Sequence, residues 1–368
     1  MQMFGRTVIY TDVASVTAGN VREVLTKALS VHHKNRSEIE YLFDYYKGKT
    51  PILSKTKEVR PTINHKICEN RANEIVNFKT GYCFGEPVQY IQRGEKKSLV
   101  NAIDELNDYM FALDKAAADR RIADWMHIAG QAYRMALPTK EDEDVPFEYY
   151  TLDPRYTFVV YSNGIGNKPV MAVKYVVNDK HLPVYSVYTQ DMYFEIEESA
   201  IKKAQPHVLG MIPIIEYPAN DARLGAFEIV LPLLDALNEV SSNRLDDIVQ
   251  YVNSFLALLG GQIDEDGMKN LEAYKMLCLP EGVDAKYLSV AMQQGDIQTL
   301  ADALRHSILS ICGIPSQAAE SASTSDTGSA VIMRDGWESA EAQMKSVELE
   351  FKRSEKEFLR LVLRILRD

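Results

Sequence analysis

The feature that most constrains this chain is an apolar stripe that runs outward from residue 230, followed by a second stripe that returns before residue 313. In the first stripe, apolar residues recur at helical steps: Val230, Leu234, Leu237, Leu245, Ile248, Val252, Phe255 and Leu259. This spacing predicts a helix of about thirty residues that ends at Gly260 and Gly261. Residues 296–312 predict a returning helix, closed by Gly313 and Pro315. A long lone helix needs a partner for its apolar side, so we expect the two to run out and back as a pair.

The residues before this pair predict a different kind of structure. Helical patterns alternate with a region of short apolar segments that are separated by turn signals such as Asn163-Gly164. We therefore expect an α+β unit in which a small, mostly antiparallel sheet lies beside helices, ending near Asn220. The expected helices cover residues 36–47, 64–79, 98–110 and 113–135, and the expected strands cover 156–161, 170–176, 184–188, 192–196 and 212–217.

The chain after the returning helix falls into two parts. Residues 316–328 are mostly Ser, Ala and Thr with no large apolar side chain, which predicts a mobile loop. Residues 329–367 return to helical apolar spacing and predict a long helix with Gly336 as its kink point. At 46% hydrophobic and 25% charged residues, the 368-residue chain has the composition of a folded globular protein.

The charge of the chain is unevenly distributed. There are 41 basic and 52 acidic residues, a net charge of −11, so nothing in the bulk charge favours DNA or an anionic membrane. Residues 225–313 hold thirteen acidic and five basic residues, a net of −8. An acidic wall of this kind would repel a phosphate backbone rather than bind it.

The sequence holds no complete catalytic or ligand motif. A phosphate-loop ending at residues 46–50 lacks its opening glycine, where Phe43 stands, and a dinucleotide pattern at Gly164 and Gly166 has Pro169 in place of its third glycine. The four cysteines have no C-x-x-C spacing and the seven histidines form no metal-ligand cluster. We therefore expect no disulfide, no metal, no cofactor and no enzyme activity.

Two alternatives remain open from the residues alone. A cytosolic α+β hydrolase could hide dispersed catalytic carboxylates, and a deep pocket with perturbed pKa values would reveal it. A pore-forming assembly is a weaker alternative, because residues 260–294 lack the alternating apolar pattern of a membrane hairpin. No signal peptide pattern or bilayer-length apolar run is present, so we expect a protein that is cytosolic or packaged in a particle.

Several local patterns occur in an order that resembles the portal, or head-to-tail connector, proteins of tailed double-stranded DNA phages. The likeness covers roughly residues 36–367 and depends on the sum of the patterns rather than on any one of them. They are Gly81–Val88, Leu152–Tyr161, His207–Asn220 leading into Phe227–Val230, and Ile311–Pro315 before Thr327–Ala330.

The resemblance implies both an architecture and a role. Family members form a ring, typically of twelve subunits, at one capsid vertex of the virion, and are assembled in the bacterial cytoplasm. The ring passes double-stranded DNA and contacts terminase, the major capsid and scaffolding proteins and a head-completion or tail adaptor; no membrane is involved. By likeness, residues 1–223 would be the wing, 224–259 a stem helix, 260–294 the clip, 295–315 the returning stem helix, 316–328 the tunnel loop and 329–368 a long C-terminal helix with a short or absent crown.

The same resemblance gives candidate site residues. The DNA-channel loop would present Ser316, Gln317, Ser321, Ser323, Thr324, Ser325, Asp326 and Thr327. The acidic lining of the channel would be Asp235, Glu239, Asp246, Asp247, Asp296 and Asp302. The clip would use Asp264, Glu265, Asp266 and Lys275, and Gly336 would be a hinge.

Overall fold

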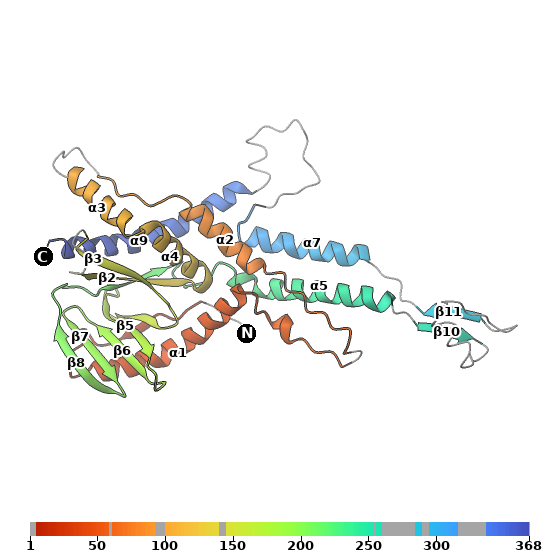
Figure 1. Cartoon of the computed structure of the whole chain (residues 1–368), viewed down its shortest axis with the longest axis horizontal. Coiled ribbons are helices and arrows are strands. Elements are labelled where there is room, and N and C mark those ends of the chain that lie inside the picture. The colour runs from red at the N-terminus through yellow and green to blue at the C-terminus, as the bar shows by residue number, and fades with distance from the viewer. Residues whose placement is uncertain are drawn as a thin grey trace. The chain divides into compact units, whose positions relative to one another are not determined.

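A computed structural model describes residues 5–58, 61–92, 100–139, 145–252, 255–259, 284–288, 294–315 and 336–367 (Figure 1). The chain divides into two compact units, each made from separate stretches of sequence. Unit 1 contains residues 1–49, 70–232 and 307–368, and unit 2 contains residues 50–69 and 233–306. Each unit is described by itself below.

Unit 1 is built on a six-stranded sheet with the order β1-β4-β5-β6-β7-β8. β1 runs parallel to β4, and every other neighbouring pair is antiparallel. The antiparallel strands follow one another along the chain and are joined by short turns, as the turn signals predict. The bounds are β1 Ile9–Thr11, β4 Thr157–Ser162, β5 Pro169–Val177, β6 Pro183–Tyr188, β7 Met192–Glu197 and β8 Ala200–Pro206.

The two faces of this sheet bury different neighbours, as the alternation of side chains along a strand requires. In β4, Phe158 and Val160 pack in a cluster with Val21 and Val24 of the long helix α1 (Val21–Tyr46). The residue between them, Val159, packs in a second cluster that includes Tyr133 of a smaller sheet. The six-stranded sheet is therefore covered by α1 on one face and by strands on the other.

The smaller sheet has three antiparallel strands in the order β3-β2-β9, with bounds β3 Phe147–Leu152, β2 Gln131–Pro138 and β9 Ile214–Pro218. Helices α4 (Lys115–Ala129) and α9 (Trp337–Ile365) contact β2 and β9. Ile122, Tyr217 and Phe358, one each from α4, β9 and α9, share one core cluster. Unit 1 also contains α2 (Arg71–Phe84), α3 (Val100–Ala112) and the short 3-10 helix η3 (Glu228–Val230).

Unit 2 holds most of the outgoing and returning helices. α5 (Leu231–Val252) and α7 (Gln294–Ile311) run side by side in Figure 1, and a hydrogen bond from Arg244 to Gln298 joins them. β10 (Phe255–Leu259) and β11 (Asp284–Leu288) form an antiparallel pair beyond α5. The segment Thr50–Glu69, which begins with the 3-10 helix η1 (Pro51–Ser54), belongs to the same unit.

The structure confirms the α+β class, the five expected strands and the returning helix. The stem helix expected over residues 224–259 is wrong at both ends, because α5 begins at Leu231 and ends at Val252, and Phe255–Leu259 is a strand. A short continuous apolar run fits a buried strand as well as a helix, so periodicity alone does not separate the two. The wing assigned to residues 1–223 also loses residues 50–69 to unit 2.

The helix expected over residues 113–135 is two elements, α4 and strand β2. Gly130 separates them with a left-handed φ of 76°, and its N–H donates to the carbonyl of Met126, the usual chemistry of a helix end. The expected helix at 64–79 instead covers 71–84, and α1 begins fifteen residues earlier than its predicted start at residue 36. Strands β1, β3 and β8 were not predicted.

Candidate functional site

Four of the six predicted channel carboxylates are exposed on the helix pair of unit 2. Glu239 and Asp247 lie on α5, and Asp296 and Asp302 lie on α7. Asp302 forms an ion pair with Arg305 at 2.9 Å and accepts hydrogen bonds from Gln298, and the Gln298 bonds are the main cause of its lowered pKa. The fifth, Asp235, is half-buried. The two helices therefore present an acidic surface to solvent.

Asp246, the sixth, is not part of that surface, so its assignment to the lining is wrong. Its side chain is fully buried and forms an ion pair with Lys57. It also accepts hydrogen bonds from the backbone N–H of His65 at 2.8 Å and from His65 Nδ1 at 2.7 Å. Burial opposes ionisation, but the bonds from Lys57 and His65 outweigh it and lower the pKa of Asp246 to about 2. This carboxylate holds the unit together instead of facing a channel.

Thr50–Glu69, which we call the strap, is fixed along α5 by a row of polar side chains. The backbone N–H groups of Glu69 and Ile67 donate to Asn238 Oδ1 at 2.8 Å and to Ser242 Oγ at 2.9 Å, respectively. The Glu69 carboxylate reaches both helices, since it pairs with Arg305 of α7 at 2.9 Å and accepts a bond from Ser241 of α5 at 2.6 Å. The strap thus joins α5 to α7 by polar contacts.

Sequence reasoning missed the strap, although a signal was present. Asn238, Ser242 and Asp246 follow at intervals of four, so they form a polar row on a helix that was judged only by its apolar residues. All three are buried, and buried polar groups require partners. Such a row predicts that a hydrogen-bonding segment lies against it.

The remaining predicted site residues can be placed only in part. The loop residues 316–328 and the clip residues Asp264, Glu265, Asp266 and Lys275 lie outside the described residues. Gly336, the predicted hinge, is the N-cap of α9 with a left-handed φ of 81°. The described part of α9 therefore begins directly after this glycine.

A buried ionic cluster anchors α9 to the rest of unit 1. Glu355 of α9 accepts hydrogen bonds from Tyr90 at 2.5 Å and Tyr217 at 2.7 Å, and pairs with Lys115 at 2.9 Å and Arg134 at 3.2 Å. Burial raises the pKa of this carboxyl, but the two cations more than offset the effect and hold it below its usual value. α9 is consequently fixed to strand β2 and to helix α4 by charge as well as by apolar packing.

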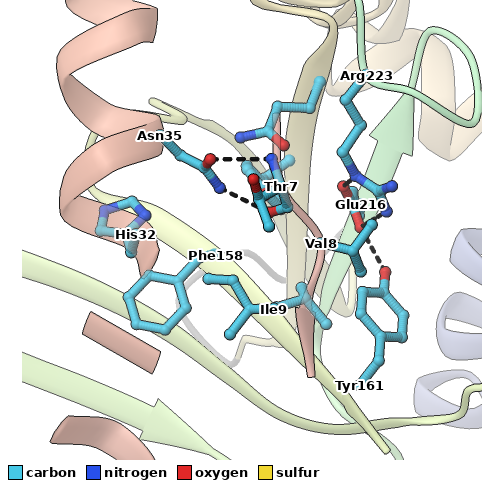
Figure 2. Close-up of a pocket in the computed structure, with 12 residues that line it drawn as sticks. Thr7, Val8, Ile9, His32, Asn35, Phe158, Tyr161, Glu216 and Arg223 are labelled. Atoms are coloured by element: carbon cyan, nitrogen blue, oxygen red, sulfur yellow. Dashed lines mark hydrogen bonds and ion pairs between the residues drawn. The ribbon is translucent and has the colours of Figure 1, made fainter. Parts of the chain in front are cut away.

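A small cavity in unit 1 tests the hydrolase alternative (Figure 2). It has room for about one water molecule. The carboxylate on its wall, Glu216, is taken up by Arg223 at 2.6 and 3.0 Å and by the Tyr161 hydroxyl at 2.5 Å. His32 lines the opposite side, and burial lowers its pKa to about 4. The site leaves neither space for a substrate nor an unpartnered carboxylate, so it does not support the hydrolase alternative.

Other chemistry was sought in the part of the chain that the structure describes. Within it, no group of three or more His, Cys, Asp or Glu side chains is placed to hold a metal ion. None of the described helices has the length and apolar character that crossing a membrane requires. Burial raises the pKa of the Cys83 and Cys312 thiols to about 11, which makes them poor nucleophiles.

Comparisons with known proteins bear on the whole chain. A family model described as phage portal protein, SPP1 Gp6-like, matches residues 26–368. Among solved structures, one similar chain comes from the virion of a native gene transfer agent particle, with 14% identity, a TM-score of 0.45 and coverage of 84% of this chain and 81% of that one. Another comes from the neck of an empty particle of that kind computed with C6 symmetry, with 15% identity, a TM-score of 0.44 and coverage of 71% of each chain. No curated protein matches the sequence.

Proposed function

The chain belongs to the SPP1 Gp6-like family of phage portal proteins, and from this premise we propose that its copies form a closed ring through which double-stranded DNA enters and leaves a capsid. Its role is structural. We place the ring, of about twelve subunits, at one vertex of the virion. Terminase, a tail adaptor and the capsid proteins would contact it there.

The observation that carries the proposal is the acidic helix pair of unit 2. α5 and α7 run out and back, hold exposed carboxylates such as Glu239, Asp247 and Asp296, and are tied together by the strap through Glu69. Each phosphate that Lys or Arg neutralises releases counterions and adds affinity. A wall with few cations and many carboxylates therefore lets DNA slide without binding, which suits a conduit.

Within this proposal, residues 316–328 form the loop nearest the DNA, and Gly336 is the hinge between that loop and α9. The clip residues Asp264, Glu265, Asp266 and Lys275 face the terminase or the adaptor. These assignments derive from the family order of parts and from the small polar side chains of the loop. They define the variants that test the proposal.

The experiment is electron microscopy of the purified full chain together with sedimentation velocity over a concentration series. We expect rings with a central opening and a species many times the mass of one chain. A heterologous contact that repeats around an axis closes in this way. A strict monomer at high concentration would contradict the proposal, and so would open filaments without any closed ring.

A further inference from the structure

The two halves of α9 carry opposite charge. Its first half bears Glu338, Glu341, Glu348 and Glu350 against Lys345, whereas residues 352–367 bear six cations and two carboxylates. One of those two carboxylates, Glu355, is buried in the ionic cluster. In a chain whose net charge is −11, this is a strong local excess of positive charge.

Five of these cations form a single row that we call the basic stripe: Arg353, Lys356, Arg360, Arg364 and Arg367. At three to four residues apart they occupy one side of the helix and extend over about 21 Å. All five are exposed, and the side chains of Arg353 and Arg360 are 74% and 68% exposed. The helix lies along unit 1 to the C-terminus in Figure 1.

The opposite side of α9 is fixed in the protein core. Phe351, Phe358 and Val362 are buried in the cluster with β2 and β9, and Glu355 is held by Arg134 and Lys115. The backbone that bears the stripe is therefore rigidly attached, and the cations keep their spacing without a partner. A preorganised row of charges binds a repeating anion with a smaller loss of conformational entropy.

The contacts within the protein leave the stripe available. Arg353 lies 3.6 Å from Glu350, Arg360 pairs with Glu357 on the same surface, and Arg364 donates to the carbonyls of Leu209 and Gly210. Exposed pairs three residues apart contribute little free energy. Among the described residues, Lys356 and Arg367 form no ion pair.

The composition of the stripe favours a phosphate ligand over a helix-dipole effect or a protein partner. Favourable interaction of cations with the helix dipole is limited to the last turn, whereas these five residues span about four turns. A protein interface is anchored by buried aromatic and apolar side chains, but only Leu349 and Leu363 are exposed apolar residues along this half of α9. Four of the five cations are arginines, whose guanidinium groups match phosphate oxygens in geometry.

We propose that the basic stripe of α9 binds the phosphate backbone of double-stranded DNA. The proposal deepens the function proposed above, because it supposes that DNA is the molecule the ring handles. It gives the chain two opposed surfaces for the same polymer, an acidic helix pair that lets DNA slide and a basic helix that retains it. In a ring, many copies of a weak site would add up to firm retention.

The test measures binding of the purified full chain to a fluorescent 30-bp duplex over a range of salt concentrations. The variant carries R353Q, K356Q and R360Q, which leaves out Arg364 because it bonds to backbone carbonyls. The matched control carries K27Q, K34Q and K345Q, three exposed lysines elsewhere in unit 1, and so loses the same charge. We expect the stripe variant to bind at least tenfold more weakly, with a salt dependence reduced by about three phosphates, and the control to change less than twofold.

Several outcomes would overturn the proposal: no measurable duplex binding by the wild type, a stripe variant within twofold of it, or an equal loss in the control. A stripe variant that binds DNA normally but no longer enters capsids would instead assign the stripe to an acidic protein partner. Sedimentation of the same samples separates the two proposals. Absence of rings counts against the portal function, whereas rings with unchanged DNA affinity count against the stripe alone.

Discussion

Arg134, in the middle of strand β2, is a fully buried cation that connects three elements of unit 1. Its guanidinium pairs with Asp119 of α4 and Glu355 of α9. It also lies over the rings of Tyr217 and Phe358, at 5.2 and 4.9 Å from their centroids. Strand alternation points this residue at α9, because its neighbours Tyr133 and Met135 pack toward the six-stranded sheet.

Replacing Arg134 with methionine should lower the free energy of unfolding by about 3–5 kcal/mol, since Asp119 and Glu355 would share a buried site with only Lys115 for charge compensation. Urea denaturation measures the difference. The matched change Arg360→Gln removes an arginine that is 68% exposed and should alter stability by about 0.5 kcal/mol or less. Equal effects of the two substitutions would show that the buried cluster is not a stabilising feature.

Asp246 should make the stability of unit 2 depend on pH. Its pKa falls from 3.8 to about 2 on folding, so its contribution of about 2 kcal/mol is complete above pH 4 and is lost as the pH falls toward 2. The Asp246→Asn variant lacks this contribution at every pH. The stability difference between wild type and variant, measured by urea denaturation, should therefore narrow from pH 5 to pH 2; a constant difference would contradict the assignment.

At the scale of elements, the end of α4 depends on one glycine. Gly130 has a left-handed φ, and a Cβ at this position would meet the carbonyl oxygen of Arg223 at 2.0 Å. Both the backbone angle and the close approach therefore exclude a side chain. This glycine turns the chain from α4 into the central strand of the smaller sheet.

Gly130→Ala should destabilise the protein by at least about 2 kcal/mol more than Gly166→Ala. Gly166 shares the left-handed conformation, with a φ of 87°, but has open space where its Cβ would be, so its substitution should cost only the backbone strain of about 1–2 kcal/mol. Thermal unfolding of the two variants gives the comparison. If both lose the same stability, the close contact with Arg223 is unimportant.

The sequence predicted those elements whose signals are local. Turn residues and alternation placed β4 to β7, because each hairpin is specified by its own short turn. β1 was missed, since a three-residue strand gains its stability from pairing with β4, about 150 residues away along the chain. The strap was missed for a similar reason: its partners Asn238 and Ser242 are distant in sequence, and no regular pattern marks an irregular segment.

The predicted loop of residues 316–328 lies outside the described residues, yet it gives a clear prediction. Removing residues 321–325 should leave ring formation and the unfolding temperature nearly unchanged, since the deleted side chains carry little apolar surface. Packaging or retention of DNA should fall. Wild-type DNA yield would rule out the DNA-facing role, and loss of rings would make the loop an assembly element instead.

At the scale of the whole molecule, the isolated chain should neither bind nor hydrolyse ATP. The position of the missing phosphate-loop glycine is taken by Phe43, which is in helix α1 and stacks on Trp125 at 5.0 Å. Gly164 and Gly166 lie in the turn between antiparallel strands β4 and β5, not at a helix N-terminus as a dinucleotide site requires. Calorimetry with ATP and a phosphate-release assay test this expectation; tight binding, or turnover in a preparation free of terminase, would contradict it.

The division of the chain into two units has a mechanical consequence. The backbone passes between them four times, after residues 49, 69, 232 and 306. A unit inserted once into another has only two such links. Any pulling force on unit 2, such as friction from a polymer moving past it, is therefore shared among four covalent connections, and the strap supplies two of them.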